Sequence, residues 1–210
     1  MKINKWLLLI LLISFIATIF IYSSLPDSIP RHWNIRGEID AYGHKNMVFF
    51  TALTPIGLYA LMLLMPKIDP KRKSYSKHKK AYEILTVIVI MFLIIIHWAL
   101  IFVALGGNVD IILLIKASIG LLFIIIGNYM GQIRHNYFFG IRTPWTLANE
   151  TVWRKTHRVG GYGFIVIGIV FLLSTFINNN LGFIIPMSTV IFIIFGIVIY
   201  SYVEYTKIVR

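Results

Sequence analysis

The residues with the greatest capacity for chemistry gather in one polar and aromatic segment, residues 140–161, of an otherwise apolar chain. Thr143 before Pro144 is typical of a helix N-cap followed by proline at the first helical position. Asn149 before an acidic residue predicts a second N-cap, with the acid near the positive end of the new helix. We therefore expect a short helical turn, a break near Asn149 and a helix that continues through Arg158.

The side chains of this segment suit the boundary between a membrane and the cytoplasm. Tryptophan rings favour the headgroup region, and arginine and lysine side chains are attracted to anionic lipid. A well-capped interfacial linker without chemistry is the alternative. The residues to which we assign a role at the cytoplasmic face are Gly140, Arg142, Thr143, Pro144, Trp145, Thr146, Trp153, Arg154, His157 and Arg158.

The composition identifies an integral membrane protein. The 210 residues are 58% hydrophobic with a mean hydropathy of +0.80, whereas soluble domains have about 45–50% apolar residues. The length suits one membrane domain, residues 1–210. A net charge of +12 would suggest nucleic-acid binding in a soluble protein. Here the cations fall between apolar spans, so we expect no direct contact with nucleic acid. The absence of cysteine excludes disulfides and zinc–thiolate sites.

Six apolar segments predict the fold class: an all-α membrane protein, a bundle of six transmembrane helices with a short interfacial helical segment before the fifth. A helix of 22 residues reaches roughly 33 Å, enough to cross a hydrocarbon core of about 30 Å. The first segment resembles a signal peptide, but its length and the lack of a clean cleavage site favour a retained span. The segments are residues 6–22, 47–65, 84–105, 109–130, 162–177 and 181–203.

The distribution of lysine and arginine predicts that both termini are cytoplasmic. In that orientation sixteen of the twenty basic residues lie on the inner side and three on the outer side, and Lys116 lies within a span. The same orientation defines an extracellular loop at residues 25–46, a basic cytoplasmic loop at residues 66–83 and a cytoplasmic signature segment at residues 131–161.

The extracellular loop is the only outer segment long enough to contact a ligand. It is either a packed cap over the bundle or a ligand-contacting surface. A metal site formed by His32, Asp40 and His44 is a weaker alternative, because the spacing matches no common site. The basic loop either touches anionic lipid or contacts a cytoplasmic protein. The candidate residues of the extracellular loop are Pro30, His32, Trp33, Asn34, Gly37 and Asp40.

Two polar residues, His97 and Lys116, lie inside the third and fourth spans. Each is nine or ten residues from the glycine pair at 106–107 in the intervening turn, so we expect them at a similar depth in the outer half of the membrane. Lys116 can extend its amine toward the interface. Alternatively, the two side chains form a polar spot inside the bundle.

Gly127 and Gly131 form a G-x-x-x-G pattern at the inner end of the fourth span. The pattern permits the close approach of two helices, either within this chain or between two copies of it.

The sequence lacks the signatures of common catalytic sites. It contains no H-E-x-x-H and no G-x-S-x-G. The eight acidic residues include none in the middle of a span, where a proton pump or an intramembrane protease would need them. We therefore predict that the protein is not an enzyme.

Three stretches, in order along the chain, resemble the SdpI family of bacterial membrane proteins, which includes immunity factors against secreted peptide toxins. Residues 140–161 resemble the family signature. Residues 25–40 are similar to the small domain of unknown function that often precedes that signature, and Pro-Lys-Ile-Asp-Pro at 66–70 is similar to the second loop of the family.

This resemblance implies a non-enzymatic, multi-pass protein of the bacterial plasma membrane that protects its producer from a secreted toxic peptide. It also implies a receptor that holds a cytoplasmic autorepressor at the membrane once the peptide is present. The implied partners are the lipid bilayer, a secreted peptide toxin outside and a repressor protein inside, with no cofactor and no metal. The alternative is a small transporter or channel that uses His97 and Lys116.

Overall fold

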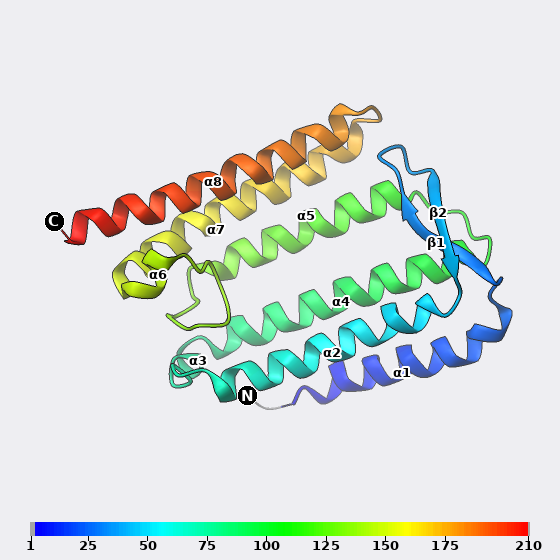
Figure 1. The fold of residues 1–210 in the computed structure, drawn as a ribbon, viewed down its shortest axis with the longest axis horizontal. Coiled ribbons are helices and arrows are strands. Elements are labelled where there is room, and N and C mark those ends of the chain that lie inside the picture. Colours follow the sequence, from blue (N-terminus) through cyan, green and yellow to red (C-terminus); the bar gives the residue numbers. More distant parts are fainter. Residues whose placement is uncertain (1–2, 210) are drawn as a thin grey trace. The chain divides into compact units, whose positions relative to one another are not determined.

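The computed structural model describes residues 3–209, and helices dominate it (Figure 1). Six helices within that range are long and apolar enough to cross a membrane, which confirms the predicted fold class. Lys2 and Arg210, two of the cations used to predict the orientation, lie outside the described residues. The six helices are α1 (Lys5–Ile21, extended by η1, Tyr22–Ser24), α2 (Met47–Ile68), α4 (Lys79–Ala104), α5 (Ile111–Met130), α7 (Glu150–Leu173, extended by η2, Ser174–Phe176) and α8 (Leu181–Val209).

Several helices are longer than their apolar segments. α7 begins at Glu150, twelve residues before the predicted span at 162, so the signature and the fifth span share one continuous helix. α4 begins at Lys79 and therefore includes the last cations of the basic loop. Charged residues can continue a helix beyond the hydrocarbon, because intrahelical hydrogen bonds do not depend on hydropathy. Two short helices, α3 (Ser74–Lys77) and α6 (Pro144–Ala148), lie in the loops.

The loop at residues 25–46 contains a β-hairpin that the sequence did not predict. β1 (Ser28–Trp33) pairs antiparallel with β2 (Ile39–His44), with irregular register around His32. The turn between them needs Gly37, whose φ is +80°. Pro30 within β1 argues against a strand in the sequence, but a two-stranded sheet consists only of edge strands, which tolerate proline.

The chain folds into two compact units. The first comprises Met1–Leu63 and Val87–Ile115, and the second comprises Leu64–Thr86 and Lys116–Arg210. The boundaries fall inside α2, α4 and α5, so each of these helices contributes one end to each unit. The single domain 1–210 stays a prediction.

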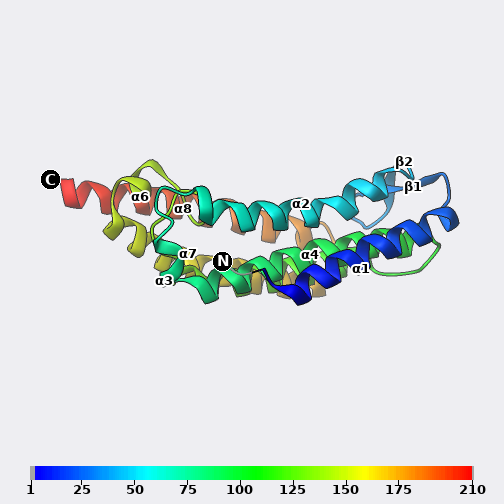
Figure 2. The same cartoon turned by 90° about the horizontal axis from the view of Figure 1, so that it is seen from below.

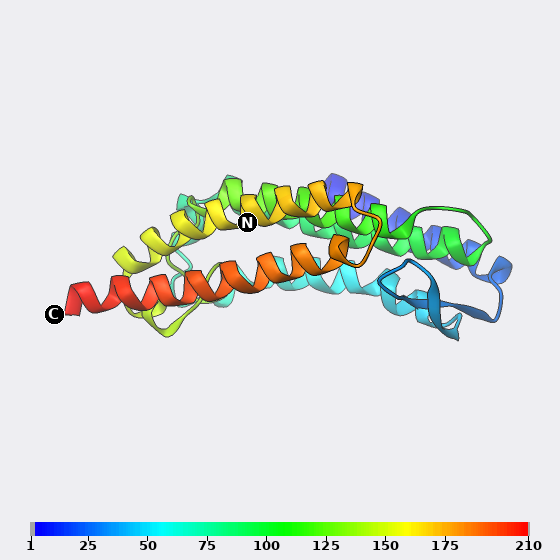
Figure 3. The same cartoon turned by 90° about the horizontal axis from the view of Figure 1, so that it is seen from above.

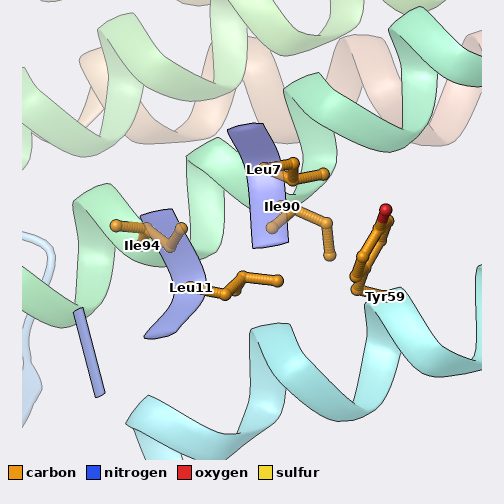
Figure 4. Packing of buried hydrophobic residues seen from close by; sticks show 5 residues of the cluster. All are labelled: Leu7, Leu11, Tyr59, Ile90 and Ile94. Atoms are coloured by element: carbon orange, nitrogen blue, oxygen red, sulfur yellow. The ribbon is translucent and has the colours of Figure 1, made fainter. Parts of the chain in front are cut away.

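In the first unit, α1, α2 and α4 run alongside one another (Figure 2). Their shared core is a cluster of five buried side chains (Figure 4), Leu7, Leu11, Tyr59, Ile90 and Ile94. A second cluster joins the hairpin to the helix ends and contains Leu25, Ile29, Val48, Leu100 and Ile101. The hairpin is therefore packed onto the bundle through Ile29, which is fully buried.

In the second unit, α7 and α8 run side by side (Figure 3). α5 approaches α7 at glycines: a Cβ on Gly127 would lie 2.6 Å from the Gly161 carbonyl oxygen, and a Cβ on Gly168 would lie 2.5 Å from that of Gly120. The small-residue pattern at Gly127 thus serves packing within this chain. Gly131, its partner in the pattern, faces open space.

Large apolar side chains cover the outward faces of the helices. Trp6, Phe20 and Phe192 are each at least three-quarters exposed. In water such faces would be costly, whereas hydrocarbon chains solvate them without penalty. The exposed apolar faces therefore agree with a membrane location.

Candidate functional site

The two predicted caps at the start of the signature are present. Thr143 and Thr146 form a reciprocal capping box: the Thr143 hydroxyl accepts from the Thr146 amide at 3.1 Å, and the Thr146 hydroxyl accepts from the Thr143 amide at 2.8 Å. Asn149 caps α7 by accepting from the amides of Thr151 and Val152. The Thr143 hydroxyl also lies 3.1 Å from the Ser201 hydroxyl, which attaches α6 to α8.

Trp153 is the centre of the signature, and it lies inside the protein. Its side chain is fully buried, and its indole N–H donates to the Ile133 carbonyl at 2.8 Å. Its ring lies between two histidines, with centroids 5.0 Å from His135 and 4.0 Å from His157. The expectation that Trp153 faces the lipid headgroups is wrong, because residues 133–135 pack against the ring and satisfy its only donor.

His157 ties α7 to the chain before α6. Its Nε2 accepts the backbone N–H of Ile141 at 3.0 Å, so the proton of a neutral ring is on Nδ1 and is donated to the Trp153 carbonyl at 2.9 Å. Gly140 has a φ of +115°, and a Cβ there would collide with His157 Nε2. Glycine at position 140 is therefore required both for the backbone conformation and for the approach of the imidazole.

The second loop and the signature are joined by buried polar side chains. Asp69 is 2% exposed, and its carboxylate accepts from the Tyr75 hydroxyl at 3.1 Å and from the Tyr137 amide at 2.9 Å. Asn136 accepts from the amides of Phe138 and Phe139, and the Tyr75 hydroxyl lies 3.3 Å from its amide oxygen. Burial, and then the Asp69 charge, raise the pKa of Tyr75 above its ordinary value, so the hydroxyl keeps its proton and remains a donor.

Two further histidines of this cluster are neutral at neutral pH. The Lys71 amine lies 2.7 Å from His135 Nδ1, and burial followed by the Lys71 charge lowers the pKa of His135. Burial lowers the pKa of His78 to about 4. Its contact with the Ser74 backbone acts in the opposite direction but is the smaller effect. His78 Nδ1 accepts from the Arg134 amide at 3.2 Å, while its Nε2 has no partner within residues 3–209.

The remaining signature side chains point outward. The Arg142 guanidinium donates to the Tyr137 carbonyl at 2.9 Å and is exposed. Arg154 and Arg158 are exposed on α7, while the Lys155 amine is 2.6 Å from the Glu204 carboxylate on α8. The Trp145 ring is half-buried, with its centroid 5.1 Å from that of Tyr202. A cationic surface thus lies outside a rigid, buried aromatic centre.

The hairpin brings candidate residues of the loop at 25–46 together. His32 Nδ1 is 2.6 Å from the Asp40 carboxylate across the strands, and the Asn34 side chain accepts from the amides of Arg36 and Glu38 to close the turn. A hydrogen bond from Asn34, and then the Arg36 charge, lower the pKa of Glu38. Among residues 3–209, no group of three His, Cys, Asp or Glu side chains is placed to hold a metal ion.

His97 joins three helices of the first unit. Its ring lies between two threonine hydroxyls, 2.9 Å from that of Thr18 on α1 and 2.8 Å from that of Thr51 on α2. A neutral imidazole has one N–H, so it donates to one hydroxyl and accepts from the other. His97 is 1% exposed, and these two hydrogen bonds give both nitrogens of its buried ring a partner.

Lys116 lies in the second unit and has a different partner. Its amine donates to the carbonyl of Ser174 at 3.0 Å, and Ser174 is the C-cap residue of α7. A cation there satisfies a terminal carbonyl and faces the negative end of the helix dipole. A polar spot shared by His97 and Lys116 stays a prediction.

Sequence reasoning missed the residues that hold the signature in place, namely Asp69, Lys71, Tyr75, His78, His135 and Asn136. One signal was available, since Asp69 is the single acid in the Pro-Lys-Ile-Asp-Pro stretch. Nothing local distinguishes His135 or Asn136 from surface loop residues, because their contacts with the second loop are with residues more than sixty positions away in the sequence.

These features define a six-span, α-helical membrane protein, and its residues 132–202 match the family described as SdpI/YfhL protein family. Residues 9–54 match a second family description, Domain of unknown function (DUF1648). The resemblance predicted from the sequence is therefore confirmed, for the signature and for the preceding domain.

The chain is similar to Immunity protein SdpI of Bacillus subtilis (strain 168). The two are 29% identical over 208 residues, which cover 99% of this chain and 98% of that protein. No solved structure matches this chain.

Proposed function

We propose that this chain is an immunity protein of the bacterial plasma membrane that confers resistance to a secreted peptide toxin without enzymatic turnover. The observation that carries the proposal is the similarity to Immunity protein SdpI, which extends over 99% of this chain and 98% of the relative. The aligned length includes the residues of the hairpin and of the signature, which form the two surfaces considered below.

We also propose that the protein acts as a receptor. The hairpin would contact the peptide outside the cell, and the exposed signature cations, such as Arg142 and Arg154, would hold a cytoplasmic repressor. The buried cluster around Trp153 supports this assignment, because it gives the exposed cations a rigid base. This orientation rests on the positive-inside bias of the sequence.

Immunity is tested by deleting the gene in its source organism and growing the deletion strain together with the wild type. The deletion strain should be killed, and this chain supplied on a plasmid should restore its survival. Toxin recovered from the medium of the protected cells should be intact by mass spectrometry. Survival of the deletion strain beside the wild type, without the plasmid, would refute the immunity proposal. Cleaved toxin would refute the non-enzymatic mechanism.

The receptor role needs a variant that folds normally. Arg142→Ala is suitable because it removes one exposed side chain, whereas Trp153→Ala would empty a buried site. Arg142→Ala should weaken the retention of a tagged repressor in the membrane fraction while the amount of inserted protein is unchanged. A small transporter that uses Lys116 is the alternative. It predicts that Lys116→Leu abolishes protection while Arg142→Ala has no effect.

A further inference from the structure

An open hollow of about 160 Å³ lies at the inner end of the α5–α7 contact. It lies entirely within the second unit. Its walls come from two helices, and the signature helix contributes Arg158. The residues that line the hollow are Gly127, Asn128, Gly131, Arg158, Gly161, Tyr162 and Ile165.

The hollow exists because glycines occupy the positions where side chains would fill it. Gly127 and Gly161 bring the two backbones together, and a Cβ on Gly161 would lie 2.8 Å from the Gly127 carbonyl oxygen. Gly131 directly follows the last residue of α5, and a Cβ there would have no atom within 4 Å. The helices therefore touch at one level and leave open space at the next.

Three polar side chains at this hollow lack partners. Arg158 and Tyr162 are one turn apart on α7, and Asn128 faces them from α5. Within residues 3–209, none of their side chains forms a hydrogen bond or an ion pair. By contrast, Lys155 on the same helix is paired with Glu204. A guanidinium with five free donors at the edge of an apolar span requires an acceptor, either from water or from a ligand.

The rest of the lining is apolar. Ile165 continues the same face of α7 toward the membrane interior, below the polar rim. An occupant must therefore offer acceptor oxygens at one end and a hydrocarbon chain at the other. Free phosphate has only the first of these properties, and a phospholipid has both.

We propose that this hollow binds the phosphate headgroup of an anionic phospholipid from the adjacent leaflet. Arg158 binds the phosphate oxygens, Asn128 and Tyr162 supply further donors, and one acyl chain lies along Ile165. Arginine matches a phosphate through parallel N–H donors, and basic pockets between helices are suited to anionic headgroups. The proposal is independent of the immunity function.

The test uses the full chain, delipidated in a neutral maltoside detergent and titrated with phosphatidylglycerol or phosphatidylcholine under native mass spectrometry. Wild type should bind one phosphatidylglycerol in preference to phosphatidylcholine. Arg158→Ala should weaken that binding by about tenfold, the loss expected for one charge-assisted hydrogen bond. Gly131→Leu should do the same while the charge is kept, because its side chain fills the hollow.

Arg154→Ala is the matched control, since it removes an exposed arginine of the same helix that does not line the hollow. Equal losses in Arg154→Ala and Arg158→Ala would overturn the proposal. So would equal binding of the two lipids, or displacement of phosphatidylglycerol by equimolar inorganic phosphate. A wild-type dimer that Gly131→Leu converts to monomer would assign the hollow to a second copy instead. Circular dichroism melting before the titration verifies that all three variants are folded.

Discussion

At the scale of single residues, Asn136 fixes the conformation of the loop at residues 134–139. Its side chain donates to the carbonyls of Arg134 and Phe139 and accepts from two backbone amides. The side chain is fully buried, so no water can replace these bonds. A loop that lacks regular structure is thereby given one defined conformation against Trp153.

Asn136→Ala should destabilise the protein by at least about 2 kcal/mol, because it leaves buried backbone groups without partners. The measurement is unfolding of the purified protein by titration with sodium dodecyl sulfate in mixed micelles. Asn178→Ala is the control, since that exposed asparagine has no side-chain hydrogen bond among the described residues. Equal effects of the two substitutions would contradict the organising role of Asn136.

His78 predicts a pH dependence of stability. Its pKa is about 4 in the folded protein, against an ordinary value of 6.5, so the unfolded state binds the extra proton between these two values. Stability should therefore be complete above about pH 6.5 and fall as the pH decreases toward 4, with a loss of roughly 2 kcal/mol by about pH 5.

The check is the unfolding midpoint measured between about pH 7 and pH 5. His78→Gln should reduce the slope, because the side chain no longer gains a proton. Asn178→Gln, an exposed substitution that changes no titratable group, should leave the slope unchanged. A steeper slope in His78→Gln would show that the linkage has the wrong sign.

At the scale of elements, the α5–α7 contact depends on the absence of side chains at its glycines. Gly127→Leu would place a Cβ 2.6 Å from the Gly161 carbonyl oxygen, and backbone cannot move aside as a flexible side chain can. We expect a loss of about 1–3 kcal/mol from overpacking. The unfolding titration in mixed micelles measures it.

Gly196→Leu provides the comparison for this prediction. Gly196 lies on α8, and a Cβ there meets no atom within 4 Å. The substitution should change the unfolding free energy little, apart from the gain in helix propensity from replacing glycine. If Gly127→Leu were equally harmless, the two helices would not be held together by backbone contact.

At the scale of the whole molecule, the predicted orientation can be tested because the chain contains no cysteine. Ile35→Cys places a thiol in the hairpin turn, and Ser76→Cys places one in the basic loop; both positions are exposed. On intact cells, the first should react with an impermeant maleimide and the second only after lysis. Gly37 is unsuitable for this purpose, since its φ of +80° disfavours any other side chain. If only Ser76→Cys were labelled on intact cells, the true orientation would be the reverse of the predicted one.

Sequence alone determined the features that depend on local interactions or on composition. The caps at Thr143 and Asn149 are correct because each joins groups no more than three residues apart. The six spans are correct because apolar length is a property of one segment. The similarity of residues 132–202 to the SdpI/YfhL family was likewise readable from the order of the motifs.

Only the tertiary structure decided which side chains face the interior. Trp153 is buried, His97 joins α1 and α2, and Lys116 caps α7, each through partners distant in the sequence. Hydropathy could not reveal this, because lipid is as apolar as a protein core, so buried and lipid-facing positions carry the same residue types. The hairpin escaped prediction for a related reason: packing of Ile29 against the bundle, rather than strand propensity, stabilises two short strands.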